Sequence, residues 1–424
     1  MNYLLYGMGI GNQSIKKYFD YYNIKYQVYE DNCQIFDYNK LLNNVKLIIK
    51  SSGIPNNTHF LLSVKEKNID VVTDLEFFFQ IKEIDKCICV TGSNGKTTVT
   101  SLLQEILKEE GYEACGNIGI PVFDKIDNQN NKLIIEASSY MLEYVKCFKP
   151  NVFIILNIEK HHLDHHHTFI NYLKAKIKPL KNMGKDDIVI YQKDNLILER
   201  IINCYEMKKY AFSIDDESSN CYYKNSFIYL NNEKVLETDK LNLIGRHNKE
   251  NVMVVLLTLK ALNINYQKKI NRIYQFKPLS HRLEKVFSNY SSSILFINDS
   301  KSTNIHSLEV AIKAIKDEYK NKKIYLIVGG MKINQDYSSL NKYESIFDKI
   351  YLYGKAGAEY LKGLAKNHVW YKDLKTLLDN ILKEKYENND LILFSPGAPS
   401  YDEFKSFEER GEYFKRIVKK YQAS

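Results

Sequence analysis

The sequence feature that most constrains the fold is the stretch KCICVTGSNGKTTVTSLLQEILKEEGY at residues 86–112. Its first six residues are mostly apolar, which is typical of a buried strand. From Val99 onward, apolar side chains recur at i, i+3, i+4, i+7 and i+8, the spacing of one helix face. Between these two parts lies the loop GSNGKTT. Backbone N–H groups of such a loop, with the N-terminus of the following helix, bind phosphate oxygens. The stretch therefore predicts a strand, a phosphate-binding loop and a helix in succession.

The loop residues have separate expected roles. Lys96 is expected to neutralise a terminal phosphate, and the hydroxyl of Thr97 or Thr98 to ligate Mg²⁺. The loop is shorter than usual, because the common pattern G-x-x-x-x-G-K would place a glycine where Val90 stands. The alternative is a tight turn with no ligand, and the flanking strand and helix argue against it.

Apolar runs that read as strands alternate with amphipathic stretches along all 424 residues. This alternation predicts an α/β protein whose parallel sheets carry helices on both faces. At roughly 150 residues per domain, the length suits about three domains. A new strand after Ile84 and a proline at position 278 suggest the boundaries, giving domains at 1–84, 85–277 and 278–424. Residues 200–240 read as irregular β structure, and residues 251–262 as a long helix.

Composition excludes several classes of protein. Apolar residues make up 44% and charged residues 26% of the chain, which fits a folded soluble protein rather than a disordered one. The net charge of +9 comes from basic residues interleaved with acidic ones, so no nucleic-acid partner is expected. No apolar run reaches the roughly 18 residues of a membrane span, so no membrane insertion is expected. Seven scattered cysteines suggest no disulfide framework and favour a cytoplasmic location.

Two further predicted strands end in polar side chains. Residues 133–135 lead into Glu136, and residues 152–156 lead into Asn157 and the cluster HHLDHHH at 161–167. Since the carboxyl ends of parallel strands meet at one edge of a sheet, Glu136 and one histidine are expected to meet Mg²⁺ and substrate there. A zinc or nickel site made by the histidines is the alternative. For any single histidine, an exposed loop position without a function is the default.

The sequence GMGIG at residues 7–11 follows a strand expected at 2–6 and precedes a helix expected near 14–22. Glu30 or Asp31 lies about 20 residues later, as in dinucleotide-binding folds. The pattern G-x-G-x-x-G is not met, since position 12 is Asn. Three interpretations stay open: a Rossmann-like domain for another nucleotide, which is favoured, an NAD site, or a tight turn alone.

Three polar segments follow later in the chain. They are GRHNKEN at 245–251, read as a loop before the long helix, HRLE at 281–284, and NDSKSTN at 298–304, which ends a strand and caps a helix. Asn, Asp, Ser and Thr cap helices routinely, so none of the three is a site by itself. Together they suggest nucleotide contacts from more than one domain.

Taken in order, these motifs resemble those of the Mur ligases, and within that family those of the members that add D-glutamate. The resemblance covers nearly the whole chain. TGSNGKTT is similar to the family's ATP loop, and GNIGIP at 116–121, EASSYMLE at 136–143 and NIEKHHLDHH at 157–166 are similar to the motifs that follow it. The most specific stretch is SPGAPSYDEFKSFEERG at 395–411, which resembles S-P-x-x-x-S-x-D-x-F-x-x-F-x-x-R-G of the D-glutamate enzymes.

The resemblance implies a site residue by residue. For ATP it implies Gly92, Ser93, Asn94, Gly95, Lys96, Thr97, Thr98, Asn248, Asn251, His281, Arg282 and Asp299. For metal it implies Thr97 and Glu136 on one Mg²⁺, with His162 and a carbamylated Lys176 at a second. For the substrates it implies Asn117, Ser139 and His162, and a D-glutamate pocket of Lys301, Thr303, Lys332, Ser400 and Phe407. The implied catalytic residues are Lys96, His162, Lys176 and Arg282.

The resemblance also implies a chemistry. An ATP-dependent ligase of peptidoglycan precursor synthesis would join the L-alanyl carboxyl of UDP-N-acetylmuramoyl-L-alanine to the amine of D-glutamate through an acyl phosphate. The first domain would be Rossmann-like and bind the UDP-substrate, the central one would bind ATP, and the Rossmann-like C-terminal one would bind D-glutamate and nucleotide, in a monomer. Two alternatives stay open: a related amide ligase for another amino acid or for folate, and a nucleotide- or nucleic-acid-binding protein without enzyme activity.

Overall fold

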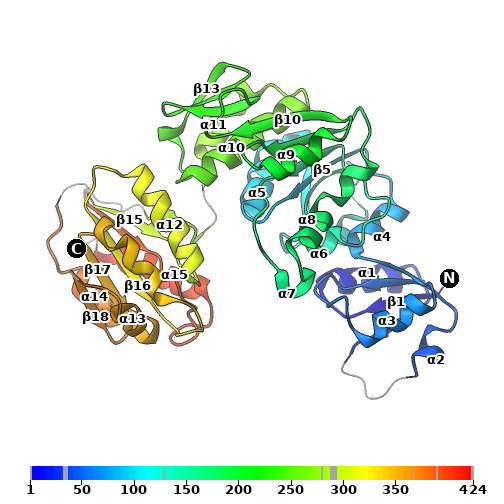
Figure 1. Ribbon diagram of the computed structural model, residues 1–424, viewed down its shortest axis with the longest axis horizontal. Coiled ribbons are helices and arrows are strands. Elements are labelled where there is room, and N and C mark those ends of the chain that lie inside the picture. Colours follow the sequence, from blue (N-terminus) through cyan, green and yellow to red (C-terminus); the bar gives the residue numbers. More distant parts are fainter. Residues whose placement is uncertain are drawn as a thin grey trace. The chain divides into compact units, whose positions relative to one another are not determined.

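A computed structural model of the chain describes residues 2–31, 37–127, 129–277, 280–286, 294–365, 367–387 and 390–421. These residues form three sheets, one after another along the sequence (Figure 1). They divide into two compact units, Met1–Asp239 with Glu250–Ile273, and Lys240–Lys249 with Tyr274–Ser424. The boundary predicted at Pro278 lies outside the described residues.

The first sheet has the order β2-β1-β3-β4, and its strands are parallel. Its strands are β1 (Asn2–Tyr6), β2 (Tyr26–Tyr29), β3 (Val45–Lys50) and β4 (Asp70–Val72). Its helices are α1 (Ile10–Tyr21), α2 (Tyr38–Leu42), α3 (His59–Glu66) and α4 (Asp74–Ile81). The Asn12 side-chain amide donates to Tyr6 O, Gly7 O and Ile49 O, which joins the ends of β1 and β3. The helix α1 begins at Ile10, four residues earlier than the predicted residue 14.

The second sheet has the order β13-β12-β11-β10-β9-β8-β5-β7-β6, parallel from β6 to β11 and antiparallel beyond. Its strands are β5 (Lys86–Thr91), β6 (Glu113–Gly116), β7 (Lys132–Glu136), β8 (Val152–Ile155), β9 (Ile188–Gln192), β10 (Lys208–Ser213), β11 (Cys221–Lys224), β12 (Phe227–Leu230) and β13 (Glu233–Glu237). The helices that accompany it are α5 (Lys96–Leu107), α6 (Ser139–Leu142), α7 (Leu163–His166), α8 (Phe169–Ile177), α9 (Leu196–Asn203), α10 (Arg246–Ala261) and α11 (Ile270–Gln275). β5 lies inside the sheet, between β8 and β7, and Cys87, Ile88, Cys89 and Val90 are buried on both of its faces, as is typical of buried parallel strands.

The third sheet has the order β14-β15-β19-β16-β17-β18, and only the β14 edge is antiparallel among the described strands. Its strands are β14 (Glu284–Val286), β15 (Leu295–Asn298), β16 (Ile324–Gly329), β17 (Lys349–Tyr353), β18 (His368–Tyr371) and β19 (Leu391–Phe394). Alternate side chains of β16 enter two separate cores. One core contains side chains of α12 (Ile305–Glu318) and α13 (Gly354–Leu361), and the other side chains of α14 (Leu374–Ile381) and α15 (Phe407–Tyr421). The prediction of an α/β fold with helices on both faces of a parallel sheet is confirmed.

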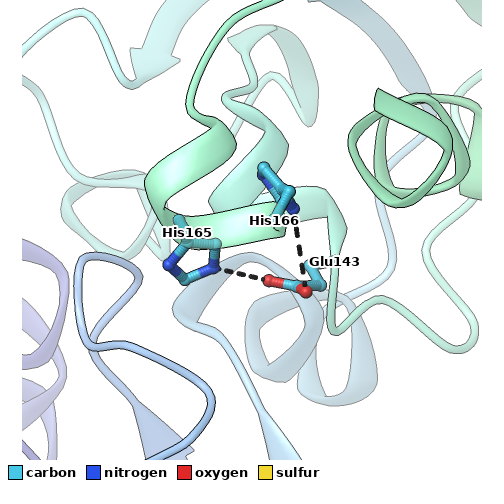
Figure 2. Close-up of side chains that lie close together, drawn as sticks. All are labelled: Glu143, His165 and His166. Carbon is cyan, nitrogen blue, oxygen red and sulfur yellow. Dashed lines mark hydrogen bonds and ion pairs between the residues drawn. The ribbon is translucent and has the colours of Figure 1, made fainter. Parts of the chain in front are cut away.

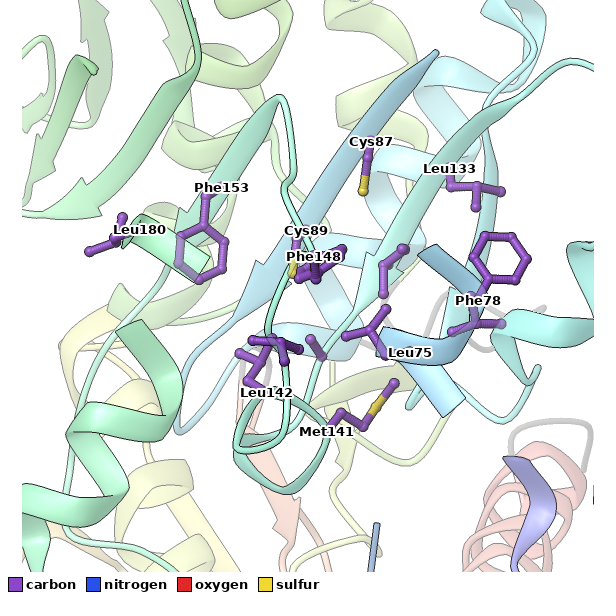
Figure 3. Packing of buried hydrophobic residues seen from close by; sticks show 14 of the residues in the cluster. Leu75, Phe78, Cys87, Cys89, Leu133, Met141, Leu142, Phe148, Phe153 and Leu180 are labelled. Atoms are coloured by element: carbon purple, nitrogen blue, oxygen red, sulfur yellow. The ribbon is translucent and has the colours of Figure 1, made fainter. Parts of the chain in front are cut away.

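One apolar core links the first two sheets. Phe78 of α4 packs edge-on against Phe123, with ring centroids 5.6 Å apart, and both belong to the same buried cluster as Leu133 and Cys87. Figure 3 shows part of this cluster, in which Leu75 and Phe78 face side chains of the second sheet. Residues on either side of the predicted boundary at 84 therefore share one hydrophobic core.

Two predictions about local structure are wrong. GRHNKEN is not a loop before a helix, because α10 begins at Arg246, directly after Gly245 with its positive φ of 95°. Residues 200–240 are regular rather than irregular, since β11, β12 and β13 form consecutive hairpins. The hairpin turns carry Asn225-Ser226 and Asn231-Asn232 at positive φ, a turn type that asparagine favours. Within the described residues, every helix is too short or too polar to traverse a bilayer.

Candidate functional site

The loop between β5 and α5 folds back on its own lysine. Lys96, the first residue of α5, donates from Nζ to Gly92 O at 2.8 Å and to Ser93 O at 3.0 Å. Gly95 caps the helix at φ 84°, and a Cβ there would lie 2.7 Å from the Asn251 side-chain oxygen of α10. Thr97 and Thr98 follow in the first helical turn and are partly exposed. The N-terminus of α5 therefore presents backbone N–H groups, hydroxyls and an ammonium group in one place.

The end of β8 holds the tip of this loop. Asn157 accepts from Asn94 N through its side-chain oxygen at 2.8 Å, and its backbone oxygen accepts from Ser93 N at 2.9 Å. The Ser93 hydroxyl lies 2.8 Å from the Tyr172 hydroxyl of α8 and accepts from Glu159 N at 2.8 Å. Sequence reasoning gave Asn157 and Tyr172 no role, and the position of Asn157 at a strand end was the available signal for it.

A second lysine reaches the same loop from α8. Lys176 is 1% exposed, and its Nζ donates to Gly92 O at 2.7 Å, so Lys96 and Lys176 share that carbonyl. Burial lowers the pKa of Lys176 well below its ordinary value, and the nearby charge of Lys96 lowers it further. A buried amine with a lowered pKa is held toward its neutral, nucleophilic form.

The end of β7 supplies a carboxylate suited to a cation. Glu136, the last residue of β7, accepts from the Asn117 side-chain amide at 2.9 Å through Oε1. Its Oε2 is buried and accepts no hydrogen bond from any described residue. A buried carboxylate oxygen without a donor is costly, and a bound cation would satisfy it. Oxygen ligands at Glu136 and Thr97 therefore fit Mg²⁺ by the chemistry of the donor set.

His162 stands at the start of α7 in the left-handed region, at φ 53°. Its ring centroid lies 5.0 Å from that of Tyr140 and 6.4 Å from that of Tyr172. Partial burial lowers the pKa of His162, and the charges of His161, Lys176 and Lys96 lower it further. Ser139, at the start of α6, lies with its hydroxyl 3.0 Å from Nε2 of His166.

The second unit contains the other expected nucleotide contacts. Asp299, just after β15, accepts from the Ser395 hydroxyl at 2.7 Å and from Leu283 N at 3.2 Å. Burial raises the pKa of its carboxyl to about 7, against the lowering effect of those two hydrogen bonds. His281 is buried at φ 67°, with Nδ1 3.0 Å from the Asn298 amide, and Arg282 next to it is exposed. Asn248, in the first turn of α10, donates to Ile244 O at 2.8 Å.

The residues expected to bind D-glutamate lie on neighbouring loops of the same unit. Lys301 Nζ lies 4.5 Å from the ring centroid of Phe407, the first residue of α15. Ser400 is buried, and Thr303 is partly exposed. Lys332 is exposed and paired with Glu359 at 2.7 Å. Lys301 therefore contacts Phe407, and the segment of Ser400 lies beside that of Lys301, since Gly397 N donates to Ser302 O at 2.9 Å, while Lys332 is engaged at the surface.

Arg410 of α15 is a residue that sequence reasoning left without a role. It is fully buried, and its guanidinium donates to Ser300 Oγ at 3.0 Å, Ser300 O at 2.8 Å and Ala398 O at 2.9 Å. These bonds tie the segment that carries Lys301 to the segment that carries Ser400. An arginine in the charged stretch FEERG reads as exposed, so only its place in the motif could have indicated it.

Two family models match separate parts of the chain. Family models of the Mur ligase middle domain and of the Mur ligase glutamate ligase domain match residues 90–259 and 281–397. The UDP-N-acetylmuramoylalanine--D-glutamate ligase of Buchnera aphidicola subsp. Schizaphis graminum is 31% identical, covering 98% of this chain and 97% of the relative. The enzyme of the same name from Elusimicrobium minutum is 34% identical, covering 90% and 86%.

Solved structures share the fold at low sequence identity. The MurF ligase of Thermotoga maritima in complex with ADP has a TM-score of 0.62 at 16% identity, covering 90% of each chain. The UDP-N-acetylmuramate-alanine ligase MurC of Thermotoga maritima has a TM-score of 0.62 at 18% identity, covering 100% of this chain and 99% of that one.

Proposed function

The chain belongs to the Mur ligase family, and from that premise we propose that it uses ATP to join D-glutamate to UDP-N-acetylmuramoyl-L-alanine, releasing ADP and phosphate. Relatives named for this reaction cover nearly the whole chain at about 30% identity. The amide product is a precursor of peptidoglycan. Among the site residues, the loop at the N-terminus of α5 carries the proposal, because the Lys96 ammonium lies there beside backbone N–H groups that can bind phosphate, and Lys176 donates to the same carbonyl, Gly92 O.

The chemistry addresses one difficulty, the poor electrophilicity of a carboxylate. The γ-phosphoryl group of ATP passes to the L-alanyl carboxylate oxygen, which breaks the bond to ADP and forms an acyl phosphate. The D-glutamate amine then attacks the carbonyl carbon and loses a proton, and phosphate leaves from the tetrahedral intermediate. Lys96, with the N–H groups of α5, offsets the charge on the transferring group, and Arg282 keeps the nucleotide-binding role that the family resemblance implies.

Thr97 and Glu136 are the proposed ligands of one Mg²⁺, supported by the unsatisfied oxygen of Glu136. Bound there, Mg²⁺ would offset negative charge on the phosphates. A second Mg²⁺ would need an anionic ligand beside His162, and Lys176 can supply it as a carbamate. Its neutral amine would bond to the carbon of CO₂ and release a proton, which the lowered pKa of Lys176 favours.

The remaining site residues keep the roles that the family resemblance implies. Asn117, Ser139 and His162 are proposed to contact the UDP-substrate, and Lys301, Thr303, Ser400 and Phe407 to form the D-glutamate pocket. Lys332 is the weakest member of that pocket, since it is exposed and paired with Glu359. The three-domain division at 84 and 278, the monomeric state and the cytoplasmic location remain predictions.

A coupled assay for ADP tests the proposal directly. With UDP-N-acetylmuramoyl-L-alanine, ATP and Mg²⁺, we expect ADP release to depend on D-glutamate and not to occur with L-alanine, L-lysine or meso-diaminopimelate. Lys96→Ala should lower turnover by at least ~10²-fold, because a preorganised charge contact to the transition state is typically worth a few kcal/mol. ADP release that is faster with another amino acid would reassign the chain to a different amide ligase.

A further inference from the structure

Two histidines of the cluster at 161–167 have their ring nitrogens close to one carboxylate. His162 faces the rings of Tyr140 and Tyr172 near the phosphate loop. His165 and His166, on α7, also pack against the Tyr140 ring, with centroids 4.5 and 5.7 Å away, but in addition turn toward Glu143, which directly follows α6 (Figure 2). His165 Nε2 lies 2.9 Å from Glu143 Oε2, and His166 Nδ1 lies 3.9 Å from Glu143 Oε1.

The His166 ring is incompletely satisfied. Its side chain is fully buried, and Nε2 lies 3.0 Å from the Ser139 hydroxyl. Nδ1 is buried and has no hydrogen-bond partner among the described residues. If Nδ1 carries the proton, a buried donor lacks an acceptor; if it does not, its lone pair faces a carboxylate oxygen across 3.9 Å. Either state leaves a buried polar atom unpaired, at a cost that a cation between the two groups would remove.

We propose that Glu143, His165 and His166 form a binding site for a divalent transition-metal ion of the zinc class. One ligand atom from each residue lies within 4.8 Å of the others, which is compact enough for a shared ion. Two imidazoles and one carboxylate are a known zinc set, and they leave a fourth position for water. Imidazole ligands favour zinc, copper or nickel over Mg²⁺ or Ca²⁺, so this site differs in chemistry from the oxygen site at Glu136.

Three side chains from other segments lie around Glu143. Asn56 donates to Glu143 Oε1 at 2.6 Å and lies 3.4 Å from His165 Nε2, so it bounds the site from the first-sheet segment. Lys178 donates to the backbone oxygen of Glu143 at 2.6 Å. Lys50 interacts electrostatically with Glu143, and burial lowers the pKa of Lys50 to about 8.

Metal titration of the full chain tests the site. An untagged protein is used, since a polyhistidine tag would bind the same ions, and it is stripped with chelator and kept free of nucleotide in buffer with millimolar Mg²⁺. We expect about one equivalent of Zn²⁺ by elemental analysis, and visible d–d absorption bands on adding Co²⁺. Glu143→Gln and His166→Ala should each weaken Zn²⁺ binding by at least tenfold, since even residues that only orient metal ligands contribute about 10- to 100-fold.

His167→Ala is the matched control, because His167 is exposed in the same segment and should leave Zn²⁺ binding unchanged. His162→Ala distinguishes the neighbouring site, and circular dichroism checks that each variant is folded. Glu143→Gln keeps the side-chain shape, so it decides the matter if His166→Ala does not fold. Absence of Zn²⁺ binding in the wild-type chain, unchanged binding in both ligand variants, or loss only in His162→Ala would overturn the proposal.

Discussion

At the scale of single residues, lysines that lie close together in the sequence of α8 differ in how deeply their side chains are buried. Lys176 is 1% exposed and contacts Gly92 O, whereas Lys174, two residues earlier on α8, is exposed. Lys178 points elsewhere and donates to Glu143 O. Helical geometry explains the difference, because residues two apart lie on opposite faces of a helix. Lys176 is therefore the lysine of this segment that is suited to a role at the phosphate loop.

We predict that Lys176→Met lowers kcat for ADP release by at least ~10²-fold, because it removes a preorganised group beside the transferring phosphoryl. Methionine keeps the packing volume of the buried stem. Lys174→Met on the same helix should change kcat by less than about twofold, since exposed substitutions have little effect. Similar losses in the two variants would contradict the assignment, and steady-state ADP assays at saturating substrates measure it.

Because the pKa of Asp299 is raised, we predict that the free energy of unfolding depends on pH. Burial raises the pKa of its carboxyl from 3.8 to about 7 in the folded protein. The folded state therefore holds the proton more tightly than the unfolded chain, so this group's contribution is complete below about pH 4 and is lost as the pH rises toward 7. Relative to Asp299→Asn, the wild type should lose free energy of unfolding on the order of 4 kcal/mol over that range.

Urea unfolding followed by circular dichroism at pH values from 4.5 to about 7.5 measures this effect. Asp379→Asn, at an exposed position of α14, is the control and should follow the wild-type curve at every pH. If the free energy of unfolding changed with pH in the same way for the wild type and for Asp299→Asn, the Asp299 carboxyl would be ionised in the folded state over the whole range. That result would contradict the prediction.

At the scale of elements, α15 acts as the anchor of two loops. Arg410 reaches from this helix to the carbonyls of Ser300 and Ala398, and the Ser300 hydroxyl donates back to Phe407 O at 2.8 Å. Lys301 directly follows Ser300 in the sequence, and Ser400 lies two residues after Ala398. Hydrogen bonds from a buried guanidinium are charge-assisted and strong, so they hold the two loops in one arrangement.

We predict that Arg410→Lys raises KM for D-glutamate by at least ~10-fold, because lysine cannot make the three hydrogen bonds at once and each charge-assisted bond is worth about 1.5–3 kcal/mol. KM for UDP-N-acetylmuramoyl-L-alanine should change much less. Arg416→Lys, on the exposed face of α15, is the matched control. Equal increases in both KM values would indicate general destabilisation of the unit instead of a positioning role, and thermal unfolding of each variant separates the two cases.

At the scale of the whole molecule, the first two sheets share the core that contains Phe78 and Phe123. A shared core makes local unfolding of one sheet expose apolar surface of the other, so the two are expected to open together. The second compact unit has separate cores around its own sheet. The chain is thus expected to have two levels of local stability, one for each unit.

We predict that Phe78→Ala lowers the stability of the first unit by about 3–5 kcal/mol, the usual cost of removing a buried phenyl ring. Hydrogen-exchange mass spectrometry should find faster exchange in peptides of both the first and second sheets, with the third sheet unchanged. Leu62→Ala, at a residue 52% exposed on α3, is the control and should change neither. Faster exchange confined to residues 1–84 would mean that the first sheet opens on its own.

The sequence alone determined the elements whose signals are local. The strand, loop and helix at residues 86–112, the parallel α/β class and the strand-end positions of Glu136 and Asn157 all follow from apolar spacing and glycine placement, which depend on neighbouring residues only. Asn304 is a further case, since it caps α12 as its segment NDSKSTN predicted. Asn225-Ser226 and Asn231-Asn232 were local signals for hairpins that the sequence interpretation missed.

The tertiary structure decided which of several equivalent side chains is buried. It selected Lys176 over Lys174, divided the histidines between His162 and the pair His165 and His166, and placed Arg410 inside a core although its segment is highly charged. It also began α10 at Arg246, where the sequence suggested a loop. Burial of a polar side chain depends on donors and acceptors that come from distant segments, and no local spacing encodes those partners.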